Sequence, residues 1–96
     1  MDGPAAFFSG YKNMFYVYVL KSLSTGKKYI GSTNNIERRL KEHILGSSRY
    51  TRSRGPWKLI YCEEKKTLSE AEKREKFFKT GDGRRVLEGI LTKVIS

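Results

Sequence analysis

Five residues of this chain have the side-chain types and the spacing that an active site could use. A Tyr-Val-Tyr segment ends at Tyr18, and a Tyr-Ile-Gly segment begins at Tyr29, so that two phenols fall at matched places in neighbouring strand-like stretches. Arg39 and His43 follow one helical turn apart, and a lone acid, Glu75, comes much later. Phenol, guanidinium, imidazole and carboxylate groups transfer protons and bind ions in active sites. The set could build such a site if the fold brings it together.

The elements that would position these residues can be predicted from local patterns. Residues 15–21 and 28–32 are rich in Tyr, Val and Ile, and a turn at 24–27 joins them, which predicts a β-hairpin. Apolar residues at helical spacing and the breaks between them predict the rest. We expect a helix at about 35–45, a strand at 57–63, a helix from 68 to about 79 and a third helix after the break at 80–83. The element order is β-β-α-β-α-α.

Capping patterns and apolar stripes refine these helices. Asn34 with Glu37, and Thr67 with Glu70, have the spacing of a capping box and predict two helix starts. The third helix is expected to turn its apolar residues inward, namely Val86, Leu87, Ile90 and Leu91.

Glu75 is the acid that we select as a metal ligand. It lies in the middle of the apolar stripe that Leu68, Ala71 and Phe78 form on the second helix. An unpaired carboxylate on an apolar face is costly, whereas a bound divalent cation or an arginine keeps it ionised. The other acids near the lysines are interpreted as solvated, namely Glu63, Glu70 and Glu72.

Composition limits the class of protein. The 96 residues fit one domain, which we place at 14–96 after a tail at 1–13. Twenty Lys and Arg against ten Asp and Glu give a formal net charge of +10, which favours a nucleic acid as partner. The single cysteine, Cys62, allows no internal disulfide. No apolar run approaches a membrane span and no signal peptide is evident, so a cytoplasmic location is expected.

A basic loop lies between the first helix and the third strand. It contains three arginines and a tyrosine and no acid, which favours contact with a nucleic-acid backbone over a merely solvated surface. The residues expected to bind are Arg49, Tyr50, Thr51, Arg52, Arg54 and Lys58.

Each candidate residue also has a structural interpretation. Tyr18 and Tyr29 could be packing residues with wet hydroxyl groups, and His43 could face solvent at a helix end. Glu75 could form a structural salt bridge with Arg39 or with a lysine. The joint spacing of the five residues favours the functional interpretation.

In that order and spacing, the motifs resemble those of the GIY-YIG nuclease domains. The similarity is to small stand-alone members related to the N-terminal endonuclease domain of the bacterial repair protein UvrC, and it covers about residues 15–95. Residues 16–18 stand for the first signature, with Tyr in place of the usual Gly, and residues 29–31 stand for the second. The run from Ala71 to Lys79 is similar to the helix that carries the family's metal-binding glutamate. Many members also supply an asparagine after that helix, which this chain lacks.

This resemblance implies an α+β fold with a three-stranded antiparallel sheet and hydrolysis of phosphodiester bonds with one divalent ion, Mg²⁺ or Mn²⁺. Glu75 would hold the metal, and Tyr18 or Tyr29 would accept a proton from the attacking water. Arg39 would grip phosphate oxygens, and His43 would orient a tyrosine or water or shuttle a proton.

Two functions from different classes stay open. One is a metal-dependent DNA endonuclease that selects structure over sequence, with a role in repair or recombination by analogy with relatives. The other is a nucleic-acid-binding module that keeps the fold without cutting. RNA stays open as a substrate, and a protein partner could supply the target.

Overall fold

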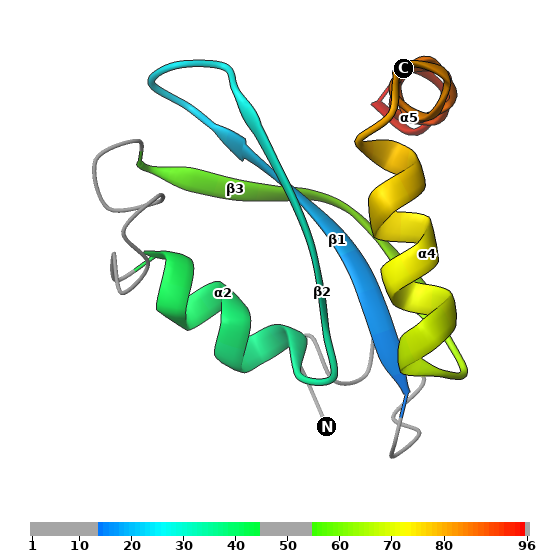
Figure 1. Cartoon of the computed structure of the whole chain (residues 1–96). Helices are drawn as coiled ribbons and strands as arrows, with labels where there is room; N and C mark the ends of the chain where they lie inside the picture. The colour runs from blue at the N-terminus through cyan, green and yellow to red at the C-terminus, as the bar shows by residue number, and fades with distance from the viewer. Residues whose placement is uncertain (1–13, 45–54, 96) are drawn as a thin grey trace.

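The computed structural model describes residues 14–44 and 55–95, in which six elements follow the order β-β-α-β-α-α. They are β1 (Phe15–Ser22), β2 (Lys28–Thr33), α2 (Ile36–Ile44), β3 (Trp57–Lys65), α4 (Leu68–Phe78) and α5 (Gly81–Ile95). The strands form one antiparallel sheet in the order β2-β1-β3, which confirms the predicted α+β class (Figure 1). None of the described helices combines the length and apolar character needed to cross a membrane. The predicted tail at 1–13 lies outside the described residues.

The central strand β1 is buried on both faces because its large side chains alternate with valines. Val17 and Val19 point to one face of the sheet, and Tyr16, Tyr18 and Leu20 point to the other. Each of these five side chains is at most 7% exposed. The sheet therefore separates two apolar cores that share one strand.

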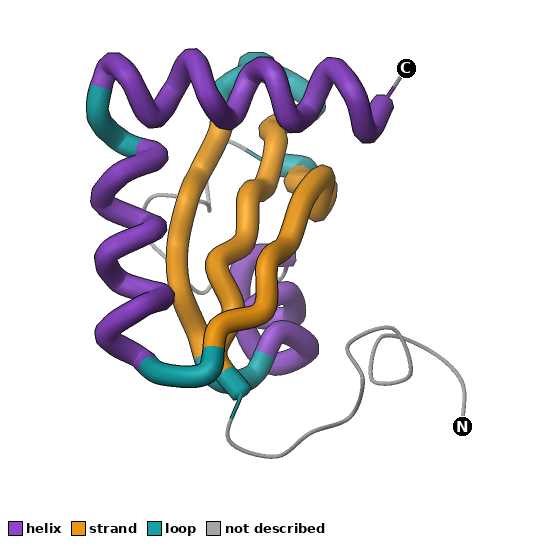
Figure 2. Tube along the Cα trace, turned by 90° about the vertical axis from the view of Figure 1, so that its right-hand side faces the viewer, coloured by secondary structure: helices purple, strands orange, loops and turns teal. Residues whose placement is uncertain are grey.

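The valine face of the sheet is covered by α4 and α5. Figure 2 shows α4 running beside the strands and α5 crossing their ends. The buried residues that these helices contribute are Ala71, Phe78, Leu87 and Leu91. Gly83 allows α5 to start tightly against α4, since a Cβ at this position would overlap the carbonyl group of Phe77. Val86, predicted to point inward, is 43% exposed, because α5 packs on the sheet through Leu87 and Leu91.

The tyrosine face of the sheet is covered by α2, which lies on the side opposite α4 (Figure 1). Ile36 from the start of α2 and Trp57 from the start of β3 are buried here with the tyrosines of β1. Leu40, one turn further along α2, packs partly buried against the same cluster. This contact fixes which face of α2 looks at the sheet.

A polar cluster ties α4 to β3. Nε and Nη2 of Arg74 donate to the two carboxylate oxygens of Glu63 at 3.0 and 3.1 Å, and the hydroxyl of Tyr61 donates to Glu63 at 2.6 Å. Burial acts to raise the pKa of Glu63, but these hydrogen bonds outweigh it and hold the pKa below its usual range. The interpretation of Glu63 as a solvated acid is therefore wrong. Glu70 and Glu72 are exposed, as predicted.

The start of α4 follows the predicted capping pattern. The hydroxyl of Thr67 accepts a hydrogen bond from the backbone N–H of Glu70 at 3.1 Å, which satisfies a donor that the first turn leaves without a partner. This cap sets the start of the helix that carries Glu75.

Candidate active site

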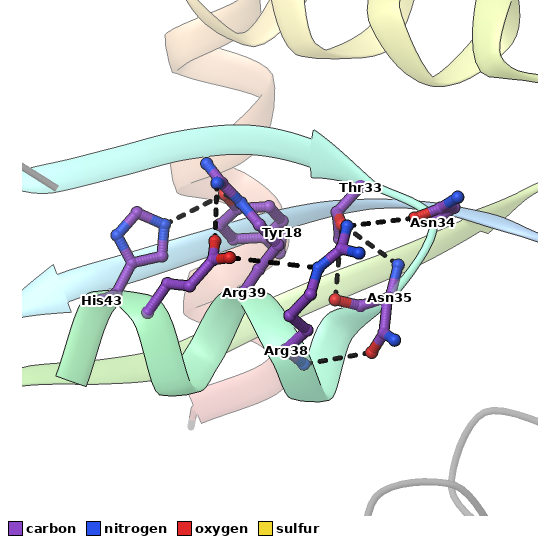
Figure 3. A network of polar contacts seen from close by, with 8 residues as sticks. Tyr18, Thr33, Asn34, Asn35, Arg38, Arg39 and His43 are labelled. Atoms are coloured by element: carbon purple, nitrogen blue, oxygen red, sulfur yellow. Dashed lines mark hydrogen bonds and ion pairs between the residues drawn. The ribbon is translucent and has the colours of Figure 1, made fainter. Parts of the chain in front are cut away.

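The hydroxyl group of Tyr18 is the meeting point of two side chains from α2 (Figure 3). Nε2 of His43 lies 3.1 Å from this oxygen, and Nε of Arg39 donates to it at 3.4 Å. Glu42 holds Arg39 from the other side by accepting from its Nη1 at 2.8 Å. Since Arg39 and His43 are one helical turn apart, a single edge of α2 presents both to the sheet.

The position of α2 is set by the residues between it and β2. The side-chain oxygen of Asn35 accepts from the backbone N–H of Arg38 at 3.0 Å, and the hydroxyl of Thr33 accepts from the N–H of Asn35 at 3.0 Å (Figure 3). Asn35 is thus the N-cap, and the capping box predicted from Asn34 and Glu37 is wrong by one position. Because these two hydrogen bonds join the end of β2 to the first turn of α2, the end of the strand sets where the helix begins.

Tyr29 extends the cluster along β2. Its ring centroid lies 4.8 Å from that of His43 and 6.2 Å from that of Tyr18, and Trp57 lies beyond it at 6.4 Å. The imidazole of His43 is therefore enclosed by aromatic rings and is only 1% exposed. Four of the five candidate residues gather on this face of the sheet.

Gly31 allows the Tyr18 ring to lie across β2. The two residues are directly paired between β1 and β2, so their side-chain positions share one face. A Cβ at Gly31 would lie 2.5 Å from the Tyr18 hydroxyl oxygen and 2.7 Å from the adjacent ring carbon. Because β2 is the edge strand, the missing side chain lets the phenol hydroxyl reach the border of the sheet.

Glu75 approaches the same strand from the opposite face. Ser32, which follows Gly31, points toward α4, and its hydroxyl donates to Oε1 of Glu75 at 2.7 Å. Nζ of Lys79, one turn further along α4, donates to Oε2 at 2.7 Å. The salt bridge between Glu75 and a lysine, which was the structural interpretation of this residue, is therefore present in the structure. The side chains of Tyr18, Tyr29 and His43 therefore lie on one side of the edge strand β2, and the Glu75 carboxylate lies on the other.

The local environment sets the charges of these groups. Burial raises the pKa of Tyr18 to about 12, although the hydrogen bond from Arg39 acts in the opposite direction. Burial also lowers the pKa of His43 below its usual 6.5, and the charge of Arg39 adds to this effect. For Glu75, burial acts to raise the pKa, but the hydrogen bonds from Lys79 and Ser32 outweigh it and lower the pKa. At neutral pH a neutral phenol therefore contacts a neutral imidazole, and the carboxylate is ionised.

The groups around Glu75 suit a single divalent cation. Mg²⁺ in phosphate-processing sites is commonly held by one or two carboxylates, with water and substrate oxygens completing its shell. In the described part of the chain no three His, Cys, Asp or Glu side chains cluster, and Glu75 is the ionised carboxylate at this border of the sheet that could contribute one ligand. The cation that now contacts Glu75 is the ammonium group of Lys79, whose side chain is 51% exposed and can turn into solvent.

The structure describes only part of the predicted basic loop. Residues 49–54, with all its predicted contacts except Lys58, lie outside the described residues. Lys58 is exposed on β3, opposite Lys21 of β1. Its predicted role in binding nucleic acid stays a prediction.

Three side chains in the site were not singled out from the sequence as functional. Glu42 and Lys79 lie one helical turn beyond Arg39 and Glu75, so helical spacing alone could have indicated both partners. Ser32 could have been found from strand alternation, which turns the residue after Gly31 to the opposite face.

Sequence comparison identifies the class of this protein. The GIY-YIG catalytic domain matches residues 14–85, a range that includes all five candidate residues. The chain belongs to the GIY-YIG family and has its nuclease-type fold.

Its relatives are small stand-alone proteins. The UPF0213 protein CPE1444 of Clostridium perfringens is 46% identical over 67 residues, which cover 69% of this chain and 71% of the relative. The UPF0213 protein BLi00048/BL00536 of Bacillus licheniformis is 50% identical over 68 residues, covering 70% and 69%. The solution NMR structure of the UPF0213 protein BH0048 from Bacillus halodurans is similar with a TM-score of 0.50 and 31% identity, covering 80% of this chain and 84% of that one.

Replacing Gly31 with alanine should displace the Tyr18 hydroxyl. The added Cβ meets a buried ring that has little room to move, so we expect Gly31→Ala to cost about 1–3 kcal/mol of unfolding free energy. Gly89→Ala is the matched control, because nothing lies within 4 Å of a Cβ in that helix, and it should stabilise by roughly 0.5–1 kcal/mol. Urea unfolding measures both changes, and the ¹⁵N shifts of the single histidine report whether its contact with Tyr18 is lost. Unchanged stability and histidine shifts in Gly31→Ala would contradict the close approach.

Proposed function

We propose that this protein is a divalent-metal-dependent endonuclease that hydrolyses phosphodiester bonds in DNA. The observation that carries the proposal is the arrangement about β2. The Tyr18 hydroxyl, held by Arg39 and His43, reaches the edge of the sheet from one face, and the ionised Glu75 reaches it from the other. Membership of a nuclease family and a net charge of +10 support a polyanionic substrate.

In this proposal Arg39 binds the scissile phosphate. Its guanidinium group is always charged and offers donors in a planar fork that matches two phosphate oxygens. Glu42 and Tyr18 hold the group in one orientation in the absence of substrate, so little side-chain freedom is lost on binding. Arg39 also places positive charge beside the Tyr18 oxygen, which makes a transient phenolate there less costly.

Tyr18 and His43 would move the proton of the attacking water. The water loses a proton to the Tyr18 oxygen while the phenol proton passes to Nε2 of His43, 3.1 Å away. The water oxygen forms the new bond to phosphorus, and the bond to the departing sugar oxygen breaks. A phenol with a pKa of about 12 is seldom ionised near neutral pH, so the neutral imidazole supplies the base strength that the phenol lacks. Tyr29 packs against the imidazole and keeps it in place.

Glu75 would hold the divalent ion, which we propose to be Mg²⁺ with Mn²⁺ as a substitute. When bound, the ion supplies positive charge for the phosphate and the departing oxygen. Ser32 fixes the carboxylate from one side, and Lys79 keeps it ionised until a metal replaces the ammonium group.

We further propose that cutting depends on the structure of the DNA more than on its base sequence. Arginine and lysine contacts to phosphates position a strand without specifying its bases. A protein partner would then direct the nuclease to its target, in repair or recombination in the cytoplasm.

Removal of the proposed metal ligand should abolish cutting. We expect Glu75→Ala to reduce metal-dependent cleavage of supercoiled plasmid and branched oligonucleotides at least about a hundredfold. Glu72→Ala, an exposed acid on the same helix, is the matched control and should cut like the wild type. EDTA should stop cleavage by the wild type and by Glu72→Ala. If the wild type binds DNA but cuts it with none of the divalent metals tested, the result would instead favour a non-catalytic binding module.

The pH dependence should report the imidazole. Since burial lowers the pKa of His43 below 6.5, it is neutral above that pH and protonated as the pH falls through the lowered value. We expect cleavage to be flat from about pH 7 to 9 and to decline only on the acid side of pH 6.5. Single-turnover rates at saturating metal measure the profile. A rate that rises about tenfold per pH unit across this range would contradict the relay, because it would indicate direct ionisation of Tyr18.

A further inference from the structure

A basic groove borders the candidate active site. It has a volume of about 790 Å³ and lies between the start of β2 and the first turns of α5. Charged and aromatic side chains dominate its walls, and those that the argument uses are Lys27, Lys28, Tyr29, Lys79, Arg84 and Glu88. We call this feature the β2–α5 groove.

Two residues belong both to the groove and to the candidate active site. Tyr29 belongs both to its wall and to the aromatic cluster, in which its ring lies 4.8 Å from the ring of His43. Lys79 also lines the groove, and its ammonium group contacts the Glu75 carboxylate at 2.7 Å. A strand with a phosphate at Glu75 would therefore pass Lys79 and enter the β2–α5 groove.

The groove has unused positive charge. Lys27 and Arg84 are exposed, and neither side chain has an ion-pair partner within residues 14–44 and 55–95. Lys28, in contrast, is paired with Glu88 at 3.0 Å across the groove. Four cations line it against one acid, and the acid is already paired. This balance suits a chain of single negative charges, such as the phosphates of a nucleic-acid backbone.

We propose that the β2–α5 groove binds the sugar-phosphate backbone of the DNA strand next to the cut, with Lys27 and Arg84 as its phosphate ligands. The inference rests on the proposed nuclease function and adds the direction in which the substrate leaves the active site. Glu88 opposes this binding, because it neutralises Lys28 and repels phosphate. The groove contributes affinity and register on the strand and reads no bases.

Charge-matched double variants test the phosphate ligands. Lys27→Gln with Arg84→Gln removes two charges from the groove, and Arg85→Gln with Lys93→Gln removes two charges from elsewhere on α5. Binding of a fluorescein-labelled single strand is measured by anisotropy in EDTA, so that nothing is cut. We expect the groove variant to bind about tenfold more weakly, with the slope of log K against log salt reduced by about 1.4. The control double should lose less than about threefold and keep most of the slope.

A variant of opposite sign tests the role of the acid. Glu88→Gln frees Lys28 and should tighten binding about threefold at low salt, whereas Glu72→Gln, with the same change in charge outside the groove, should have a smaller effect. Equal effects of the two acid variants would overturn the assignment of Glu88. Because all these side chains are exposed, circular dichroism should show unchanged folding.

The outcomes separate this inference from the function on which it rests. If the wild type binds and cuts DNA but the two double variants bind alike, the groove inference is overturned and the nuclease stands. If the groove double alone loses affinity and salt slope and the wild type cuts DNA, the inference is supported; the same loss in a protein that never cuts would overturn the place of the groove beside a cut. If the wild type binds no DNA even at low salt, the nuclease proposal fails and takes the groove with it.

Discussion

Burial of the Tyr18 phenol is the constraint on which the rest of this structure depends. At 1% exposure Tyr18 is removed from most of the bulk solvent, so partners within the protein must replace the hydrogen bonds that bulk water would make to its hydroxyl. Arg39 and His43 provide them from α2. The same contacts fix how α2 lies on the sheet. The geometry of the site thus depends on this one hydroxyl group, whereas the ring of Tyr18 and its apolar neighbours fill the core.

The edge position of β2 makes this buried hydroxyl a candidate reaction centre. Gly31 leaves room for the phenol to lie across the strand, and Ser32 beside it turns the opposite way toward Glu75. Because consecutive strand residues face opposite sides, two helices on opposite faces can direct polar groups to one border of the sheet. Placing polar groups at this border leaves both apolar cores intact, because the apolar residues of β1 fill the core on each face of the sheet.

Local rules could predict most of the fold and the composition of the site. Strand alternation indicates which side chains of β1 share a face of the sheet. The helical spacing of Arg39 and His43 indicates that both lie on one edge of α2. The partners of Glu63 could not be found in this way, because Arg74 reaches it only when α4 packs on β3. The β2–α5 groove could not be predicted from local patterns either, because it lies between a hairpin and a helix from the far end of the chain. The exposure of Val86 likewise depends on how α5 crosses the sheet.

In the proposed mechanism the Tyr18 hydroxyl takes part in the reaction and does not merely hold α2. Tyr18→Phe removes that one atom and keeps the ring that fills the core. Single-turnover cleavage and DNA affinity, measured side by side on Tyr18→Phe and the wild type, separate a role in the reaction from a role in holding α2. We expect a folded protein whose affinity for DNA changes less than about threefold and whose cleavage rate falls at least about a hundredfold, roughly the scale of lost general base catalysis. Cleavage by Tyr18→Phe at the wild-type rate would contradict the proposed mechanism.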